Sequence, residues 1–217
     1  MRNIATLQNL ATFTGSISSP YSYTPWANTM GYYKMNGDST DGSSNWRNWT
    51  DTSMSYVAGR FNQCASFNGT TSSILFNMPT VSPFTRSLWL NHTVYWAAQS
   101  VIDKLPANWI RIWTWTTRWG GIFTFNWTNI AYTQARVAGT WYHVCLTFTG
   151  GTAVLYINGV ANTTQWGLSF TDNSNLYLGR QSWWSNYLNG KIDEVIIENV
   201  ARTWPQVLAY YNNQNAN

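Results

Sequence analysis

Short runs of alternating apolar and polar residues, separated by glycine, asparagine, aspartate and serine, limit most strongly how this chain can fold. Alternation places successive side chains on opposite faces of a strand, and helical periodicity is nearly absent. The predicted strands are residues 64–67, 73–76, 87–96, 110–116, 122–127, 142–148, 154–157, 176–178 and 192–198. The sequence therefore predicts an antiparallel all-β fold, and this many strands fit a two-sheet sandwich or jelly roll.

Three local signals complete this prediction. Asn158 and Gly159 both tolerate positive φ, and they predict a tight hairpin turn between two apolar runs. Residues 203–208 predict one short C-terminal helix, with Thr203 as its N-cap and a proline in its first turn. Residues 1–30 are rich in Ser, Thr, Pro and Tyr without alternation. We interpret them as an N-terminal extension or assembly arm, and residues 31–217 as the jelly-roll domain.

Composition narrows the classes of function. Charged residues make up 9% of the chain, where about 25% is usual. Aromatic residues reach 17%, which excludes intrinsic disorder. The net charge is +4, but the basic residues are dispersed and only three of them are lysines. Nucleic acid is therefore not an expected partner. No apolar run reaches the roughly 18 residues of a membrane span. The N-terminus is no convincing signal peptide, because Gln8 and Asn9 interrupt its apolar residues.

Two cysteines, Cys64 and Cys145, allow either one disulfide or two buried thiols. A chain of 217 residues can bury a sizeable core and does not need a covalent cross-link. The cysteines therefore leave the cellular compartment open.

Eight short stretches occur in a characteristic order along the chain. They are residues 32–35 (YYKM), 59–61 (GRF), 65–70 (ASFNGT), 84–89 (FTRSLW), 139–144 (GTWYHV), 155–160 (LYINGV), 176–180 (LYLGR) and 188–195 (LNGKIDEV). Together they resemble the laminin-G-like, concanavalin A-like lectin jelly-roll family over roughly residues 31–212. The resemblance implies a jelly-roll fold. It leaves function open, because the family includes binders, adhesins, enzymes and virion parts.

A catalytic site is not predicted. A glycosidase needs two carboxylates about 5–5.5 or 6.5–9.5 Å apart, and the resemblance to laminarinase-type members would require a Glu-x-Asp-x-x-Glu strand that this chain lacks. The only glutamates, Glu194 and Glu198, should share one face of a strand, with Asp193 on the other. His92 and His143 belong to no nucleophile motif. The remaining aspartates could still form a pair: Asp38, Asp41, Asp51, Asp103 and Asp172.

The resemblance also implies a structural Ca²⁺ site, which many sandwiches of this type hold on the convex side. Asp193 would supply a side-chain ligand, and Gly69 and Asn36 would supply backbone oxygens. The alternative is that Asp193 caps a turn or accepts backbone hydrogen bonds. The polar loop 38–45 lacks the glycine and terminal glutamate of an EF-hand, so it is not predicted to bind calcium.

Tryptophans carry the functional prediction. In residues 109–115 the isoleucines alternate with larger polar and aromatic side chains, which leaves Arg111, Trp113 and Trp115 on the face opposite the core. The other predicted sugar-binding residues lie in a turn and a loop: Trp119, Trp183, Trp184 and Asn186. Indoles stack on the C–H faces of sugars, while Arg and Asn donate hydrogen bonds to hydroxyls. Tryptophan is also enriched at protein–protein interfaces, which keeps a subunit contact open.

The sequence thus predicts a non-catalytic surface protein of a virion or extracellular assembly, with a lectin-like domain that binds a glycan. An intact Met1, the extension and the low charge favour an assembling protein that needs no secretion signal. One alternative is a purely structural, self-assembling shell or filament subunit without a glycan ligand. The other is a glycoside hydrolase of the same fold.

Overall fold

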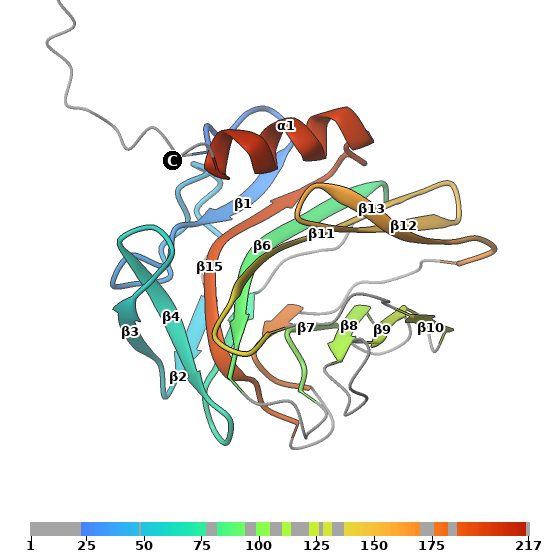
Figure 1. Ribbon diagram of the computed structural model, residues 1–217. Helices are drawn as coiled ribbons and strands as arrows, with labels where there is room; N and C mark the ends of the chain where they lie inside the picture. Colours follow the sequence, from blue (N-terminus) through green and yellow to red (C-terminus); the bar gives the residue numbers. More distant parts are fainter. Residues whose placement is uncertain are drawn as a thin grey trace, which may run out of the picture.

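A large antiparallel sheet forms the upper layer of the protein in Figure 1. Its strands are β1 (Thr29–Tyr33), β3 (Ser55–Ala58), β4 (Gln63–Asn68), β6 (Phe84–His92), β11 (Trp141–Thr149), β12 (Thr152–Ile157), β13 (Val160–Gln165) and β15 (Asn189–Glu198). They follow the order β13-β12-β11-β6-β15-β4-β3, and β1 also pairs with β15. The computed structural model describes residues 23–47, 49–76, 82–93, 99–104, 110–113, 122–125, 128–131, 137–169, 176–181 and 186–215.

Shorter strands form the facing layer. Four of them, β2 (Trp49–Thr52), β5 (Ser73–Phe76), β7 (Ile102–Lys104) and β14 (Leu176–Leu178), form a sheet in the order β2-β5-β14-β7. A three-stranded sheet contains β8 (Ile110–Trp113), β9 (Ile122–Phe125) and β10 (Thr128–Ala131), and β8 lies against β7 (Figure 1). The predicted all-β, two-layer antiparallel jelly roll is confirmed.

The main core lies between the two layers, where the alternating residues of both sheets meet. The rings of Tyr33 and Phe76 pack there at a tilt of 33° with centroids 4.6 Å apart, and Trp49 meets Tyr33 edge-on at 4.4 Å. Many further side chains in this cluster are almost inaccessible to solvent, including Ile74, Leu88, Val101, Leu155, Leu178, Leu188, Ile192 and Val195. Burial of this apolar area is the main contribution that holds the layers together.

Strand β15 contains a β-bulge that the sequence pattern does not reveal. Asp193 pairs with Trp89, but the next pair along the strand is Ile196 with Ser87, so three steps on β15 match two on β6. Glu194 lies in the bulge with φ of 50°. The extra residue breaks the simple alternation of side chains between the two faces.

The bulge corrects the predicted placement of the acidic residues. Asp193, Glu194 and Glu198 all lie on the outer face of the large sheet, rather than Asp193 opposite the other two. Asp193 accepts hydrogen bonds from the outer loop at Arg60, and Glu194 accepts one from Tyr32. The apolar residues of the strand face the core: Ile192, Val195 and Ile197.

Helix α1 (Trp204–Asn215) lies across the outer face of the large sheet (Figure 1). It is twice the predicted length, because tertiary contacts hold its Asn-rich second half. Tyr211 stacks on Trp89 at 5.9 Å, and Trp89 Nε1 donates to Gln214 Oε1 at 2.5 Å. At its start the side-chain oxygen Oε1 of Gln206 accepts a hydrogen bond from the Thr203 amide at 2.8 Å. Among the described residues, no helix has the length and hydropathy needed to cross a bilayer.

Other local predictions can be checked directly. Asn158 and Gly159 both have positive φ, 50° and 76°, as the predicted hairpin requires. Cys64 and Cys145 are free buried thiols on β4 and β11, which are not neighbours in the sheet. The described fold begins at Tyr23, so residues 23–30 of the predicted extension already pack on the sandwich. Residues 1–22 lie outside the described part.

Candidate functional site

The residues predicted to bind sugar fall partly within the described structure. Arg111 and Trp113 lie on β8, in the three-stranded sheet. Asn186 is described as well, in the segment between β14 and β15. The remaining four predicted residues lie outside the described residues: Trp115, Trp119, Trp183 and Trp184.

The segment that carries Trp183 and Trp184 is closed at its base. Arg180 and Tyr187 form an antiparallel bridge. Inside it, the Gln181 amide donates to the Asn186 carbonyl at 3.1 Å, and Asn186 Nδ2 donates to Gln181 Oε1 at 2.7 Å. Asn186 therefore holds the loop base through its side chain. Trp183 and Trp184 lie between these contacts in the sequence, outside the described residues.

Strand β8, with Arg111 and Trp113, and the loop base, with Asn186, both adjoin β7. Strand β8 lies against β7, and β14, which leads into the closed loop, pairs with β7 through Leu178 and Ile102. The Gly179 amide, at the start of the loop, donates to the Val101 carbonyl at 3.0 Å. Residues about 70 positions apart in the sequence are thus connected to the same edge strand of the small sheet.

The structure also shows exposed tryptophans that the sequence did not single out. Trp46 is 84% exposed and Trp166 is 70% exposed. Trp26 and Trp204, at 44% and 52%, are partly covered near the start of α1. No periodicity in the sequence marks these positions, because Trp26, Trp46 and Trp166 lie in loops and Trp204 is the first residue of α1. The proximity of Trp46 to several loop-forming residues was the only available signal.

The loop before Trp46 is organised by one carboxylate. Asp41 Oδ1 accepts hydrogen bonds from the amides of Tyr32 at 3.0 Å and Ser43 at 2.8 Å. Its Oδ2 accepts from the Ser43 hydroxyl at 2.8 Å and from the Arg47 amide at 3.2 Å. A carboxylate that binds both sides of a loop fixes the backbone between them. Asp41 thus has a structural role.

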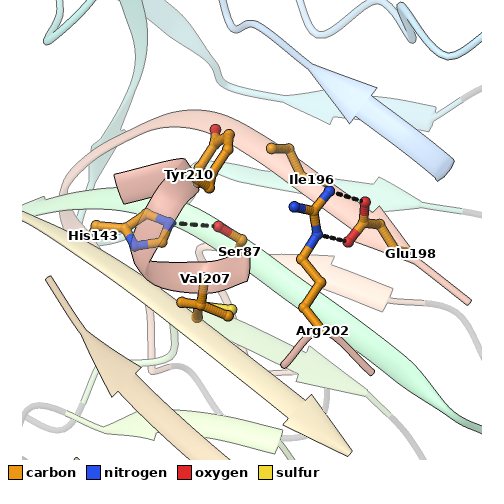
Figure 2. Close-up of a pocket in the computed structure, with 8 residues that line it drawn as sticks. Ser87, His143, Ile196, Glu198, Arg202, Val207 and Tyr210 are labelled. Atoms are coloured by element: carbon orange, nitrogen blue, oxygen red, sulfur yellow. Dashed lines mark hydrogen bonds and ion pairs between the residues drawn. The ribbon is translucent and has the colours of Figure 1, made fainter. Parts of the chain in front are cut away.

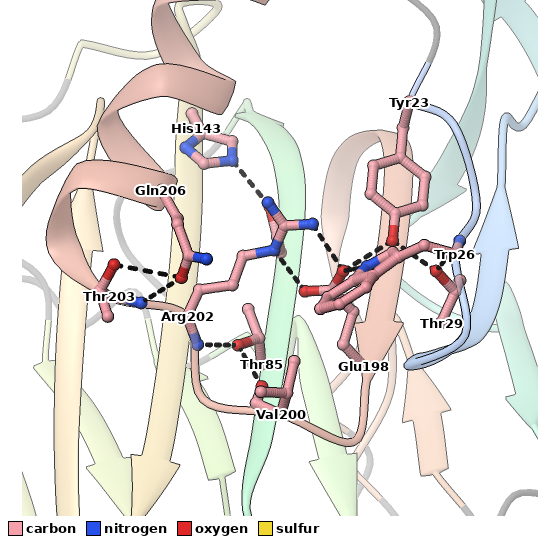
Figure 3. Close-up of polar contacts among 11 residues, drawn as sticks. Tyr23, Trp26, Thr29, Thr85, His143, Glu198, Val200, Arg202, Thr203 and Gln206 are labelled. Carbon is pink, nitrogen blue, oxygen red and sulfur yellow. Dashed lines mark hydrogen bonds and ion pairs between the residues drawn. The ribbon is translucent and has the colours of Figure 1, made fainter.

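A second carboxylate organises the outer face (Figure 3). Arg202 Nε and Nη2 donate to the two oxygens of Glu198 at 2.5 and 2.6 Å. Tyr23 OH and Trp26 Nε1 donate to Glu198 Oε1 at 2.6 and 2.7 Å. Burial and the contact with Glu198 raise the pKa of Tyr23 to about 12. This network anchors the N-terminal segment and the turn before α1 to the end of β15.

Beside this network lies a small pocket beneath α1 (Figure 2). Its cavity volume of about 10 Å³ leaves room for at most about one water. His143 Nε2 and Ser87 Oγ share a hydrogen bond of 2.7 Å at its wall. His143 is fully buried, and burial, with lesser contributions from Arg60 and Arg202, lowers its pKa to about 3. This serine–histidine contact is therefore closed to a substrate and acts in packing.

Two further carboxylates have partners within the fold, Glu194 on the outer face and the exposed Asp51 on β2. Glu194 accepts the Tyr32 hydroxyl at 2.6 Å, and burial raises the pKa of Glu194 to about 8. Asp51 accepts the hydroxyls of Ser39 at 2.5 Å and Tyr56 at 2.8 Å. Together with Asp41 and Glu198, these carboxylates have hydrogen-bond partners within the fold, which is what structural carboxylates require.

Of the predicted calcium ligands, Asp193 and Asn36 both lie near the start of β4, whereas Gly69 follows its far end. Asp193 Oδ2 accepts two backbone amides, from Arg60 and Phe61, both at 3.0 Å. Asn36 Oδ1 accepts the Gln63 amide at the start of β4. Gly69 follows the far end of β4, about 16 Å from the position opposite Asp193 at the usual rise of a strand. Within the described residues, no three His, Cys, Asp or Glu side chains form a metal-binding group. Calcium binding at Asp193 stays a prediction.

These features define a concanavalin A-like jelly roll with aromatic loops. A model of the concanavalin A-like lectin/glucanases superfamily matches residues 68–208, and the chain belongs to this superfamily. No curated protein sequence matches the chain significantly.

Solved structures give the same fold. Domain 4 of AbnA, a GH43 extracellular arabinanase from Geobacillus stearothermophilus, solved with arabinotriose, matches with a TM-score of 0.74 and 22% identity, over 85% of this chain and 98% of that domain. The binding domain of Paraclostridial mosquitocidal protein 1 matches with 0.71 and 16% identity, over 85% of this chain. The receptor-binding domain of botulinum neurotoxin type G matches with 0.69 and 15% identity, over 87% of this chain. The chain spans 52% of each toxin domain.

Proposed function

We propose that this protein is a non-catalytic carbohydrate-binding module that contacts a glycan through the aromatic residues beside β7. The observation that carries the proposal is the connection of both predicted groups to this one strand: Arg111 and Trp113 on β8, and the closed loop that contains Trp183 and Trp184. The arabinotriose-bound arabinanase domain supports it, because its whole length matches this sandwich.

The chemistry of these residues suits a neutral glycan. An indole offers a flat apolar face to the C–H groups of a sugar ring, and the guanidinium of Arg111 offers several donors to hydroxyl oxygens. With 9% charged residues, the chain has few groups that would select an ionic ligand. We therefore expect a neutral oligosaccharide or polysaccharide as the ligand.

The carboxylates support a binding function over hydrolysis. Of the eight acidic residues, Asp41, Asp51, Glu194 and Glu198 each accept side-chain hydrogen bonds that hold the fold. Asp193 accepts two backbone amides. A glycosidase needs two carboxylates that face the same bond in an open cleft, and these five are engaged elsewhere.

The setting that we propose is the outer surface of a virion or of an extracellular assembly. Around the start of α1, Trp26 and Trp204 are partly exposed, and Trp204 Nε1 donates to the Gly159 carbonyl beside the exposed Val160. Apolar side chains of this kind suit a contact with another subunit. They favour, as a second candidate function, a purely structural self-assembling subunit. The oligomeric state in solution, discussed below, separates it from a glycan-binding module.

A glycan array followed by calorimetry tests the main proposal. We expect Trp113→Ala and Trp183→Ala each to weaken binding more than tenfold, because a stacked aromatic ring is a typical binding hot spot. Trp166→Ala is the matched control, since Trp166 is an exposed tryptophan that follows β13 in the large sheet and is not one of the predicted sugar-binding residues. Unchanged binding by both variants, with unfolding curves like that of the original protein, would contradict the proposal.

A further inference from the structure

We propose that Trp46 forms a second sugar-contact site, separate from the aromatic surface beside β7. This inference rests on the proposed glycan-binding function and adds a position to it. Trp46 is 84% exposed, the most exposed large apolar side chain of the described residues. A tryptophan that is displayed in this way buries almost none of its apolar surface in the fold, so packing does not account for its place.

The backbone at Trp46 is also unfavourable for its residue type. Its φ is 50°, in the left-handed region, and Ser44, two residues earlier, has φ of 64°. A bulky residue rarely occupies this region, and such strain collects at functional sites. The four hydrogen bonds that Asp41 accepts hold the loop in this conformation. Asn45 adds another, from its Nδ2 to the Thr29 carbonyl at 2.7 Å.

This rigidity matters for binding. A ligand that stacks on a ring fixed in advance does not have to order a mobile loop, and the entropic cost of binding is smaller. Asp41 ties the loop to Tyr32 on β1, which is fully buried, while Arg47 continues into β2. The ring of Trp46 is thus carried on a loop that is held at both ends by the sandwich.

The surroundings of Trp46 favour a sugar over a protein partner. Its neighbours along the loop are polar and exposed, notably Thr40, Ser44 and Asn45. A protein hot spot normally lies among other apolar residues that exclude water from it. A single indole with hydroxyl and amide groups around it instead matches a neutral sugar ring, which has an apolar face and a polar rim.

The sheet order separates this site from the surface beside β7. Trp46 lies three residues before β2, and β2 and β7 are the opposite edges of the four-stranded sheet. Three strand spacings correspond to about 14 Å. A long polysaccharide can contact both edges at once and gains affinity from the second contact, whereas a short oligosaccharide occupies one of them. Loss of Trp46 should therefore weaken polysaccharide binding more than trisaccharide binding.

Affinity gel electrophoresis tests the inference, with linear arabinan, xylan, mixed-linkage β-glucan and galactomannan in the gels and arabinotriose as a soluble competitor. We expect Trp46→Ala to weaken retention on the bound polysaccharide at least fivefold, and Trp46→Tyr to keep it within about threefold because tyrosine retains a stacking ring. Trp166→Ala should behave like the original protein. Trp46→Gly relieves the positive φ, so it should melt at the same or a higher temperature and still bind weakly.

Failure of the Trp46 site and failure of the proposed glycan-binding function give different results. If Trp46→Ala and Trp46→Gly bind as Trp166→Ala does, while Trp113→Ala loses binding, the second site is overturned and the proposed function stands. If none of the polysaccharides retards the original protein, both fail. If Trp46→Ala changes only the molar mass measured by light scattering, Trp46 contacts a protein, and the sugar-contact site is overturned.

Discussion

Glu198 shows how much of the outer face depends on one side chain. The carboxylate is fully buried and accepts hydrogen bonds from Tyr23 and Trp26 in the N-terminal segment and from Arg202 in the turn before α1. A buried ion pair contributes modestly to stability when intact. Its disruption is costly, because the remaining charge stays buried without a partner.

We expect Glu198→Gln to lower the free energy of unfolding by about 3 kcal/mol, measured by urea denaturation, because the Arg202 guanidinium loses its counter-charge. Asp38→Asn is the matched control. Asp38 is exposed and accepts one amide, from Thr40, so its change should stay within about 0.5 kcal/mol. Equal effects of the two substitutions would show that the Glu198 network is not important for stability.

His143 predicts a pH dependence. Its pKa is about 3 in the folded protein, mainly because of burial, against 6.5 for an ordinary histidine. Between these values the unfolded chain binds a proton that the folded protein does not, so stability falls as the pH is lowered from 6.5 toward 3. The loss from this one group approaches about 1.4 kcal/mol per pH unit.

The comparison with His143→Gln isolates this contribution. Glutamine can keep a hydrogen bond to Ser87 and does not titrate, and all other titrating groups are common to both proteins. We expect the free energy of unfolding to decline less steeply below pH 6.5 in the variant, measured by urea denaturation at several pH values. Parallel curves would mean that His143 is protonated in the folded protein.

At the residue scale, the sequence could predict which residue types suit a sugar but not which tryptophans are exposed. Trp89 and Trp46 are the same chemical group, yet one is buried beneath α1 and the other is open to solvent. The difference comes from strand pairing and loop conformation. These are set by contacts such as the hydrogen bonds of Asp41 to Tyr32, Ser43 and Arg47, which no alternation of apolar and polar residues reveals.

Elements were predictable where alternation is regular. Strand β5 and strand β14 begin and end at the predicted residues, and the hairpin at Asn158 forms as expected. The bulge in β15 was not predictable, because one extra residue leaves no mark in the hydrophobic pattern. Strands with mostly exposed or polar residues, such as β2 and β13, also lack a clear signal.

Helix α1 was predictable from the sequence only in its first turns. Its capped first turn has a sequence signature, whereas its continuation through Tyr210, Tyr211 and Gln214 depends on packing against the sheet. Intrinsic helix propensity is low for asparagine and tyrosine, and tertiary contacts override it here. The positions of Asp193, Glu194 and Glu198 on the outer face are therefore set by the sheet, and α1 alone could not predict them.

On the scale of the whole molecule, the extension can be divided by its contacts. Tyr23 and Trp26 bind Glu198, and β1 pairs with β15 from Thr29 onward. Residues 23–30 thus contribute contacts that stabilise the sandwich. Only residues 1–22 are left as the proposed assembly arm.

Two truncations test this division. We expect the chain that lacks residues 1–22 to keep its melting temperature within a few degrees and to be monomeric by light scattering with size exclusion. Removal of residues 1–30 should lower the melting temperature clearly, because Glu198 loses two hydrogen-bond donors. The same melting temperature for both truncations would contradict the anchoring role of Tyr23 and Trp26. A full chain that is monomeric would remove the support for self-assembly.

The contact between Tyr23 and Tyr210, with ring centroids 6.1 Å apart, fixes how the module can be presented. The start of the described chain and the C-terminal helix both lie on the outer face of the large sheet, away from β7 and β8 (Figure 1). The described chain therefore both begins and ends on that side. The small sheet lies on the opposite side of the sandwich, where it is free to contact a ligand on a facing surface.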